Sequence, residues 1–140
     1  MKDWRLEDNV KNAVNSALPN AVHKQSMTMA SMTSNGTPDH YYDGSKRDLW
    51  VEYKFWERSL KRNDLIGGVG SNKRGYYSAL QYAWMCRRHA VGGNVVGIIG
   101  LPDRRVVIQT EPCEWLHGCT EVDAMSAKEA AAWVLDFIGS

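Results

Sequence analysis

Apolar residues recur with two different periods along this chain, which predicts a domain that mixes helices with strands. Near the N-terminus, Asp3 is a candidate N-cap and Pro19 ends the segment. Between them the apolar positions lie three or four residues apart, as one face of a helix requires: Leu6, Val10, Ala13, Val14 and Ala17. A second helix is predicted to begin near Gly75 and to carry four side chains on one face: Tyr77, Gln81, Trp84 and Arg88.

The remaining pattern predicts strands over residues 21–32, 95–101 and 105–109, with Pro102-Asp103 as the turn between the last two. Polar residues in the first of these strands suggest that it lies at the edge or at a twisted rim of a sheet. Ser126, followed three residues later by Glu129, predicts a capping box for a final helix. The apolar face of that helix comprises Ala127, Ala130, Ala131, Val134, Leu135 and Ile138.

Residues 36–56 are predicted to form a β-hairpin. Two runs of aromatic and β-branched residues flank Asp43-Gly44, and glycine tolerates the positive φ that a tight turn requires. If the loop consists of residues 44–47, Asp43 faces Asp48, and counting back along both strands places Asp39 opposite Glu52. Carboxylates on directly opposed residues repel one another, so this pair predicts a bound cation.

The second strand of the hairpin sorts its side chains onto two faces, because they alternate along a strand. One face is an apolar row suited to a core: Leu49, Val51, Tyr53 and Phe55. The other face comprises Trp50, Glu52, Lys54 and Trp56. Glu52 and Lys54 therefore share the face of Asp39, where carboxylates suit Mg²⁺ and an ammonium group could hold a water or neutralise a phosphate. The alternative is a solvated strand face with an ordinary Glu–Lys pair.

Length and charge set wider limits. The 140 residues, 44% of them hydrophobic, support one domain over residues 1–140. A formal charge of +1 does not by itself indicate a nucleic-acid binder, but basic residues concentrate in the middle third of the chain. A basic middle around an acidic metal site fits a protein that binds a phosphate backbone, whereas an ordinary wet surface is the alternative. Trp50 and Trp56 are candidates for stacking against bases.

The residues Gly36, Pro38-Asp39 and Glu52-Tyr53-Lys54 resemble the signature of the PD-(D/E)XK nuclease superfamily. Within it, residues 81–84 followed by residues 89–97 are similar to the pattern of the virus-type replication-repair (VRR-NUC) branch. Phage endonucleases that resolve branched DNA carry the same signature. The resemblance covers roughly residues 7–110 and implies an α/β (α+β) fold with a restriction-endonuclease-like core, in which helices flank a central mixed β-sheet.

The resemblance also implies roles for the matching residues. Asp39 and Glu52 would bind Mg²⁺, for which Mn²⁺ could substitute, and the backbone carbonyl of Tyr53 would complete the ligand set. Lys54 would assist the nucleophilic water, with Gln81 beside it. A carboxylate on the first helix is also expected as a catalytic metal ligand. Glu7 is the best match, with Asp8 and Asp3 as substitutes and an exposed Glu7–Lys11 pair as the structural alternative.

We therefore expect a soluble, cytoplasmic hydrolase: a homodimeric, Mg²⁺-dependent DNA endonuclease that cuts branched or structured DNA or acts as a nickase. Residues 59–75 are expected to form a mobile loop that closes on DNA. Basic residues expected to contact DNA are Arg58, Lys61, Arg62, Lys73, Arg74 and Arg88.

Two alternatives remain open. The chain could be a catalytically inactive nuclease-fold module that binds DNA or inhibits another protein. It could also be a zinc-held interaction domain, using Cys86 with His89, or the later group Cys113, His117 and Cys119. The spacings of these residues match no common structural zinc pattern, and the chain shows no signal peptide and no apolar run long enough to span a bilayer.

Overall fold

A mixed six-stranded sheet is the centre of the part of the chain that the computed structural model describes, namely residues 7–19, 23–26, 38, 40–57, 64–70 and 75–139. The strands lie side by side in chain order: β1 (His23–Ser26), β2 (His40–Asp43), β3 (Asp48–Phe55), β4 (Val95–Gly100), β5 (Arg105–Gln109) and β6 (Met125–Ser126). The β3–β4 pair is parallel and the other pairs are antiparallel. The first strand lies at the sheet edge, as predicted.

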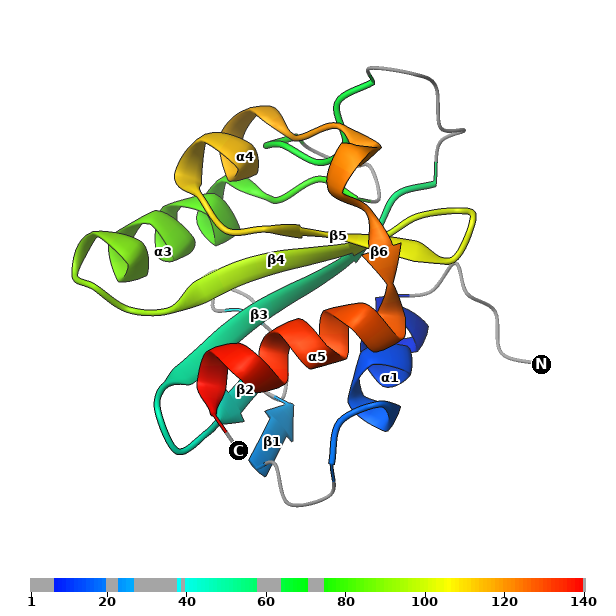
Figure 1. Cartoon of the computed structure of the whole chain (residues 1–140). Helices are drawn as coiled ribbons and strands as arrows, with labels where there is room; N and C mark the ends of the chain where they lie inside the picture. Colours follow the sequence, from blue (N-terminus) through cyan, green and yellow to red (C-terminus); the bar gives the residue numbers. More distant parts are fainter. Residues whose placement is uncertain are drawn as a thin grey trace.

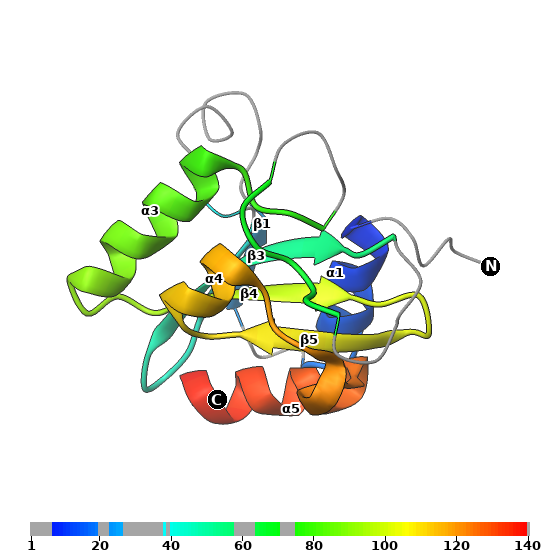
Figure 2. The same ribbon diagram turned by 90° about the horizontal axis from the view of Figure 1, so that it is seen from above.

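Helices cover both faces of this sheet (Figures 1 and 2). Helices α1 (Glu7–Ser16) and α5 (Ala127–Ile138) lie against one face, and α3 (Ala79–Ala90) and α4 (Pro112–His117) lie against the other. A short 3₁₀ helix, η2 (Glu121–Asp123), precedes β6. A mixed sheet between two helical layers is the fold class that the sequence predicts, so that prediction is confirmed. None of the helices in the described part of the chain is long and apolar enough to cross a membrane.

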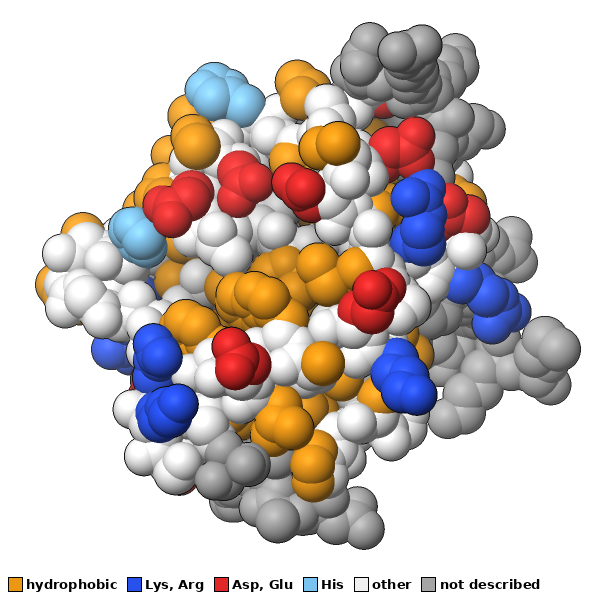
Figure 3. Space-filling model, in the orientation of Figure 1, with side chains coloured by type: hydrophobic (Ala, Val, Ile, Leu, Met, Phe, Trp, Pro, Cys, Tyr) orange, Lys and Arg blue, Asp and Glu red, His pale blue; other side chains and the backbone are white. Residues whose placement is uncertain are grey.

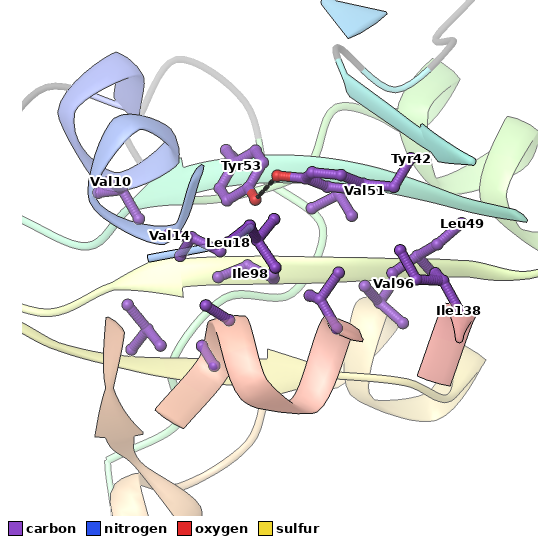
Figure 4. Close-up of a cluster of buried hydrophobic side chains, with 14 of the residues drawn as sticks. Val10, Val14, Leu18, Tyr42, Leu49, Val51, Tyr53, Val96, Ile98 and Ile138 are labelled. Carbon is purple, nitrogen blue, oxygen red and sulfur yellow. Dashed lines mark hydrogen bonds between the residues drawn. The ribbon is translucent and has the colours of Figure 1, made fainter. Parts of the chain in front are cut away.

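The core between the sheet and helices α1 and α5 contains the apolar row of β3 (Figure 4). All four predicted members of that row are buried: Leu49, Val51, Tyr53 and Phe55. The hydroxyl of Tyr53 lies 2.5 Å from that of Tyr42, which in turn donates to Asn15 Oδ1, so these hydroxyls are paired inside the core. In α1, Val10 and Val14 are buried as expected. Ala17 is exposed, and Leu18 takes its place in the core.

A second core lies on the other face of the sheet, under α3 and α4. Its buried members are Trp56, Ile66, Tyr77, Met85, Val95, Ile99, Leu101, Val107 and Trp115. Two predictions are wrong here. Trp56 is buried against Tyr76, with ring centroids 5.1 Å apart, so it is not available for stacking with bases. Tyr77 precedes α3, which begins after the N-cap Ser78, and therefore does not share a face of that helix with Gln81, Trp84 and Arg88.

The segment before α3 is packed where the structure describes it. Ile66 and Cys119 exchange two backbone hydrogen bonds of 2.7 and 3.0 Å, and Gly70 and Tyr77 are joined by a backbone bond of 3.0 Å. Ile66 is buried. Residues 66–70 therefore belong to the second core layer, contrary to the prediction of a mobile loop, while residues 58–63 and 71–74 lie outside the described part.

Helix α4, η2 and β6 were absent from the predicted order of elements. A local signal for α4 does exist: Pro112 occupies its first turn, and the Glu114 side chain accepts hydrogen bonds from the backbone N–H groups of Thr110 and Glu111, at 2.9 and 3.2 Å. The segment has only six residues, too few for a helical period to stand out.

Candidate active site on strand β3

The hairpin that carries the candidate site has the predicted register. His40 pairs with Val51 and Asp43 pairs with Asp48, and the Gly44 N–H donates to the Arg47 carbonyl at 3.2 Å to close the loop. The loop is also held by the C-terminal end of α5, because its backbone N–H groups donate to the carbonyls of residues 138 and 139. Asp39 lies outside the described residues, so its expected position opposite Glu52 stays a prediction.

Glu52 and Lys54 form an ion pair on one face of β3. The distance from Lys54 Nζ to Glu52 Oε2 is 3.6 Å, and the two side chains are 12% and 4% exposed, respectively. The low exposure of both side chains contradicts the alternative of a solvated strand face with an ordinary Glu–Lys pair. Burying two opposite charges removes their hydration, and an apolar pair of similar volume is often no less stable. The pair is therefore poorly explained by stability alone, which points to a chemical role.

A buried tyrosine lies beside this pair. Glu52 is the register partner of Gly97 on β4, and a Cβ added to Gly97 would lie 1.8 Å from the Tyr77 hydroxyl oxygen. The hydroxyl therefore occupies the space that a side chain at position 97 would fill. Burial, and then the negative charge of Glu52, raise the pKa of Tyr77 well above its ordinary value. Tyr77 is thus a neutral hydrogen-bond donor next to the candidate site.

The Tyr77 hydroxyl donates to Gln109 Oε1 at 2.7 Å, and the amide of Gln109 completes a buried network. Its nitrogen donates to the Ile66 carbonyl at 2.8 Å and to Cys119 Sγ at 3.1 Å. Burial raises the pKa of the Cys119 thiol. Within the described part of the chain, every buried side-chain nitrogen and oxygen has a hydrogen-bond partner. This network supports the floor of the site on the α3 side of the sheet.

Sequence reasoning did not single out Gly97, Tyr77 or Gln109 as members of one group. A glycine inside an apolar strand signals a close approach by another group, and a glutamine in an otherwise apolar strand signals a buried hydrogen bond. Neither signal identifies the partner. Tyr77 and Gln109 are 32 residues apart, so the contact depends on the tertiary fold.

The other predicted site residues differ in what the structure shows. The Gln81 side chain accepts from the Ser78 backbone N–H at 2.9 Å, and the Gln81 N–H donates to Ser78 Oγ at 3.1 Å, forming a capping box at the start of α3. Tyr53 directs its side chain into the opposite core. Glu7 is the first residue of α1, but its side chain lies outside the described part. Roles for Gln81, Glu7 and the Tyr53 carbonyl stay predictions.

Among the predicted DNA contacts, Arg88 is described, and the other five residues lie outside the described part. Arg88 is exposed on the last turn of α3. Its guanidinium carbon lies 5.2 Å from the ring centroid of Trp84 and 6.0 Å from that of Trp50. Trp50 precedes Glu52 by two residues on the same strand, so this cationic and aromatic group borders the candidate site.

The donor chemistry of the described residues fits a hard divalent cation, because the Glu52 carboxylate and the neighbouring peptide carbonyls offer oxygen ligands. Within the described ranges, no three histidine, cysteine, aspartate or glutamate side chains gather as a metal-binding group. A zinc-held domain built from the described cysteines therefore has no support in the arrangement of these side chains. Asp39 and the Glu7 side chain, the two further predicted Mg²⁺ ligands, fall outside those ranges.

The mixed sheet between two helical layers is the restriction-endonuclease-like fold. The chain is similar in structure to Hjc, a Holliday junction resolvase from the archaeal hyperthermophile Archaeoglobus fulgidus, with a TM-score of 0.51. The match covers 91% of this chain and 96% of Hjc at 12% sequence identity. No protein-family model matches the sequence, and no curated protein matches it. The likeness therefore establishes the fold.

Proposed function

We propose that this chain is a Mg²⁺-dependent DNA endonuclease that hydrolyses phosphodiester bonds in branched or structured DNA, or that nicks DNA. The observation that carries the proposal is the Glu52–Lys54 pair, joined at 3.6 Å on one face of β3 and nearly buried. The hairpin register that the motif requires supports it, as does the fold that the chain shares with a Holliday junction resolvase. We assign the chain to the VRR-NUC branch because of the pattern in residues 81–84 and 89–97.

Each residue has a distinct part in the proposed reaction. Glu52, Asp39, the Tyr53 carbonyl and Glu7 would hold the cation, which when bound supplies positive charge beside the phosphate. Lys54 would orient the attacking water and neutralise charge that develops on the phosphate oxygens. Tyr77, whose hydroxyl proton goes to Gln109, would fill the space beneath the site on the α3 side of the sheet. Gln81 would lie at the border of the site.

Cleavage assays test this proposal directly. Wild-type protein would be incubated with linear, flap, four-way and single-stranded DNA in Mg²⁺ or Mn²⁺, beside Glu52→Gln and Lys54→Met variants. Both variants are close in volume to the wild-type residues, so loss of cutting would report chemistry. Lys128→Ala on α5, across the sheet, is the matched control for removal of one positive charge. Cutting by neither wild type nor control, or equal cutting by all proteins, would refute the proposal.

A second candidate function is a catalytically inactive nuclease-fold module that binds DNA or inhibits another protein. The observation that favours it is the contact itself, because Lys54 already places a positive charge 3.6 Å from the Glu52 carboxylate, where a cation would otherwise bind. Such a module would bind DNA with an affinity that Mg²⁺ does not change, and Glu52→Gln would leave its binding unaltered. Calorimetric titration of the protein–DNA complex with Mg²⁺ separates the two functions, because a nuclease takes up the ion through Glu52.

We further propose that the protein acts as a homodimer. Most soluble oligomers have closed two-fold symmetry, and a dimer would present two sites to the two strands of a branched DNA. Light scattering after size exclusion measures the mass directly against the 15.8 kDa of one chain. A single-chain mass at working concentrations, with full activity, would refute this part of the proposal.

A further inference from the structure

Helix α3 and the residue that follows it carry apolar side chains at the border of the second core, and part of their surface is exposed. Leu80 is 54% exposed, and Val91, the C-cap of the helix, is 78% exposed. Trp84 is half-buried and packs against the second core. A hollow of about 270 Å³ at the C-terminal end of α3 is lined by Trp84, Arg87, Arg88 and Val91. An indole beside two guanidinium groups is the combination that binds nucleic acid without duplex structure, through base stacking and phosphate contacts.

Arg88 is held in place before any ligand binds. Its guanidinium lies over the rings of Trp84 and Trp50, whose centroids are themselves 5.3 Å apart. Its aliphatic stem crosses Gly93, where an added Cβ would lie 2.2 Å from Arg88 Cδ. No carboxylate among the described residues forms a salt bridge with Arg88, so its charge remains available for an anion. A planar guanidinium fixed by stacking suits bidentate contact with a phosphate.

The hollow is next to the candidate active site. Trp50 contacts Trp84 from β3 and shares a strand face with Glu52, two residues further on, which is a distance of about 7 Å along the strand. Tyr41 also packs against Trp50, with ring centroids 4.7 Å apart, so the indole of Trp50 has two aromatic neighbours. A group bound at Trp84 would therefore lie within a few nucleotides of the phosphate that Glu52 and Lys54 face.

A second hollow provides a contrast. Figure 3 shows hydrophobic side chains gathered between α4 and α5, with acidic side chains along the α4 side. The hollow there measures about 400 Å³ and is lined by Val95, Val96, Trp133, Phe137 and Glu111, among others. Its lining contains no lysine or arginine within the described residues. It lacks the positive charge that a phosphate needs, whereas the hollow at Trp84 has two arginines.

We propose that the Trp84 hollow binds one unpaired nucleotide of the DNA substrate, with the base stacked on Trp84 and the adjacent phosphates held by Arg87 and Arg88. The inference rests on the proposed function for the identity of the ligand as DNA. A base inside a continuous duplex is stacked on both faces and cannot present one to an indole, so the hollow selects substrates with an unpaired stretch beside the cleaved bond. The site would thus distinguish flaps and other branched ends from continuous duplex.

Binding in EDTA tests this inference apart from catalysis. Fluorescence anisotropy would compare a flap DNA that has a short unpaired strand with a continuous duplex of the same length. Wild type is expected to bind the flap more tightly. Trp84→Leu keeps the apolar bulk but removes the stacking surface, and it should weaken flap binding by about 5- to 100-fold while duplex binding stays within about twofold. Trp84→Phe should restore most of the preference.

Two further comparisons locate the effect. Single bases of the unpaired strand would be replaced in turn by abasic spacers. At one position, the spacer should weaken flap binding as much as Trp84→Leu does. With the spacer at that position, Trp84→Leu should weaken binding little further. Gly93→Ala displaces the stem of Arg88 and should also weaken flap binding, whereas Lys128→Ala on α5 should not. Duplex binding and the thermal transition of each variant verify that it is folded.

Equal affinity of wild type for flap and duplex, or a Trp84→Leu variant that keeps the preference, would overturn the inference. The inference would also be overturned if, at every abasic position, the loss of binding free energy from Trp84→Leu and the loss from the abasic spacer simply added together. These outcomes do not depend on cleavage. A wild type that shows the expected preference but cuts no DNA in Mg²⁺ would support the nucleotide site and refute the nuclease.

Discussion

Gly97→Ala tests the arrangement beneath the candidate site, because it places a methyl group where the Tyr77 hydroxyl now lies. The new Cβ would be 1.8 Å from that oxygen and 2.7 Å from the ring carbon that carries it. Both distances are far inside van der Waals contact. Tyr77 is fully buried, so its ring has no open space to enter and must move away from Gln109. We expect the variant to lose the hydrogen bond and to strain the second core.

The magnitude has two parts. Overpacking a well-filled core costs roughly 1–3 kcal/mol. Leaving the buried Gln109 oxygen without its donor costs roughly another 1–3 kcal/mol. Tyr77→Phe incurs only the second part, and it removes the atom that clashes most with a methyl group at position 97. The double variant should therefore be less destabilised than the sum of the two single variants, by about 1 kcal/mol or more.

Urea unfolding followed by tryptophan fluorescence measures these differences, provided that the slope of the free energy against urea stays constant among the variants. Gly100→Ala is the matched control. It also lies in β4, but an added Cβ there would meet Val10 on the opposite face, 2.4 Å from Cγ2. Gly100→Ala should lower the free energy of unfolding, and in the double variant its effect should simply add to that of Tyr77→Phe. A Gly97→Ala protein within about 0.5 kcal/mol of wild type, or strict additivity with Tyr77→Phe, would refute the arrangement.

Three further predictions concern stability. Ser126→Ala removes the acceptor for the Glu129 N–H at the start of α5 and should lower the free energy of unfolding by about 1 kcal/mol, whereas Ser126→Asp should not; urea unfolding decides. Arg105→Ala removes two ion pairs, with Asp103 and with Glu121, both at 2.6 Å. Because all three side chains are more than a third exposed, the change should cost at most about 1 kcal/mol in the same measurement. Because the pKa of Tyr77 is raised in the folded protein, its stabilising effect is complete below its unfolded pKa of about 10 and is lost as the pH rises above that value. The free-energy difference between wild type and Tyr77→Phe should therefore shrink between pH 9 and 11, and a constant difference would contradict the raised pKa.

The local patterns were predictable because they depend on neighbours in the chain. Alternation along β3 separated Val51 and Tyr53 from Glu52 and Lys54, and both groups lie where the period of two requires. The Asp43-Gly44 turn predicted the register of β2 with β3 to the residue. The capping box at Ser126 predicted the start of α5. The same reasoning assigned Tyr77 to α3, because it could not tell that the helix begins after Ser78.

What the sequence by itself determined is the hairpin, the sorting of its side chains onto two faces and the pairing of an acid with a lysine on one of them. Only the tertiary structure decided that Tyr77 lies against Gly97 beside Glu52, and that Arg88 is held over Trp50 and Trp84. The physical reason is the range of the interactions. A strand period or a turn acts over a few residues, whereas these contacts join segments that meet only when the sheet and its helices pack together.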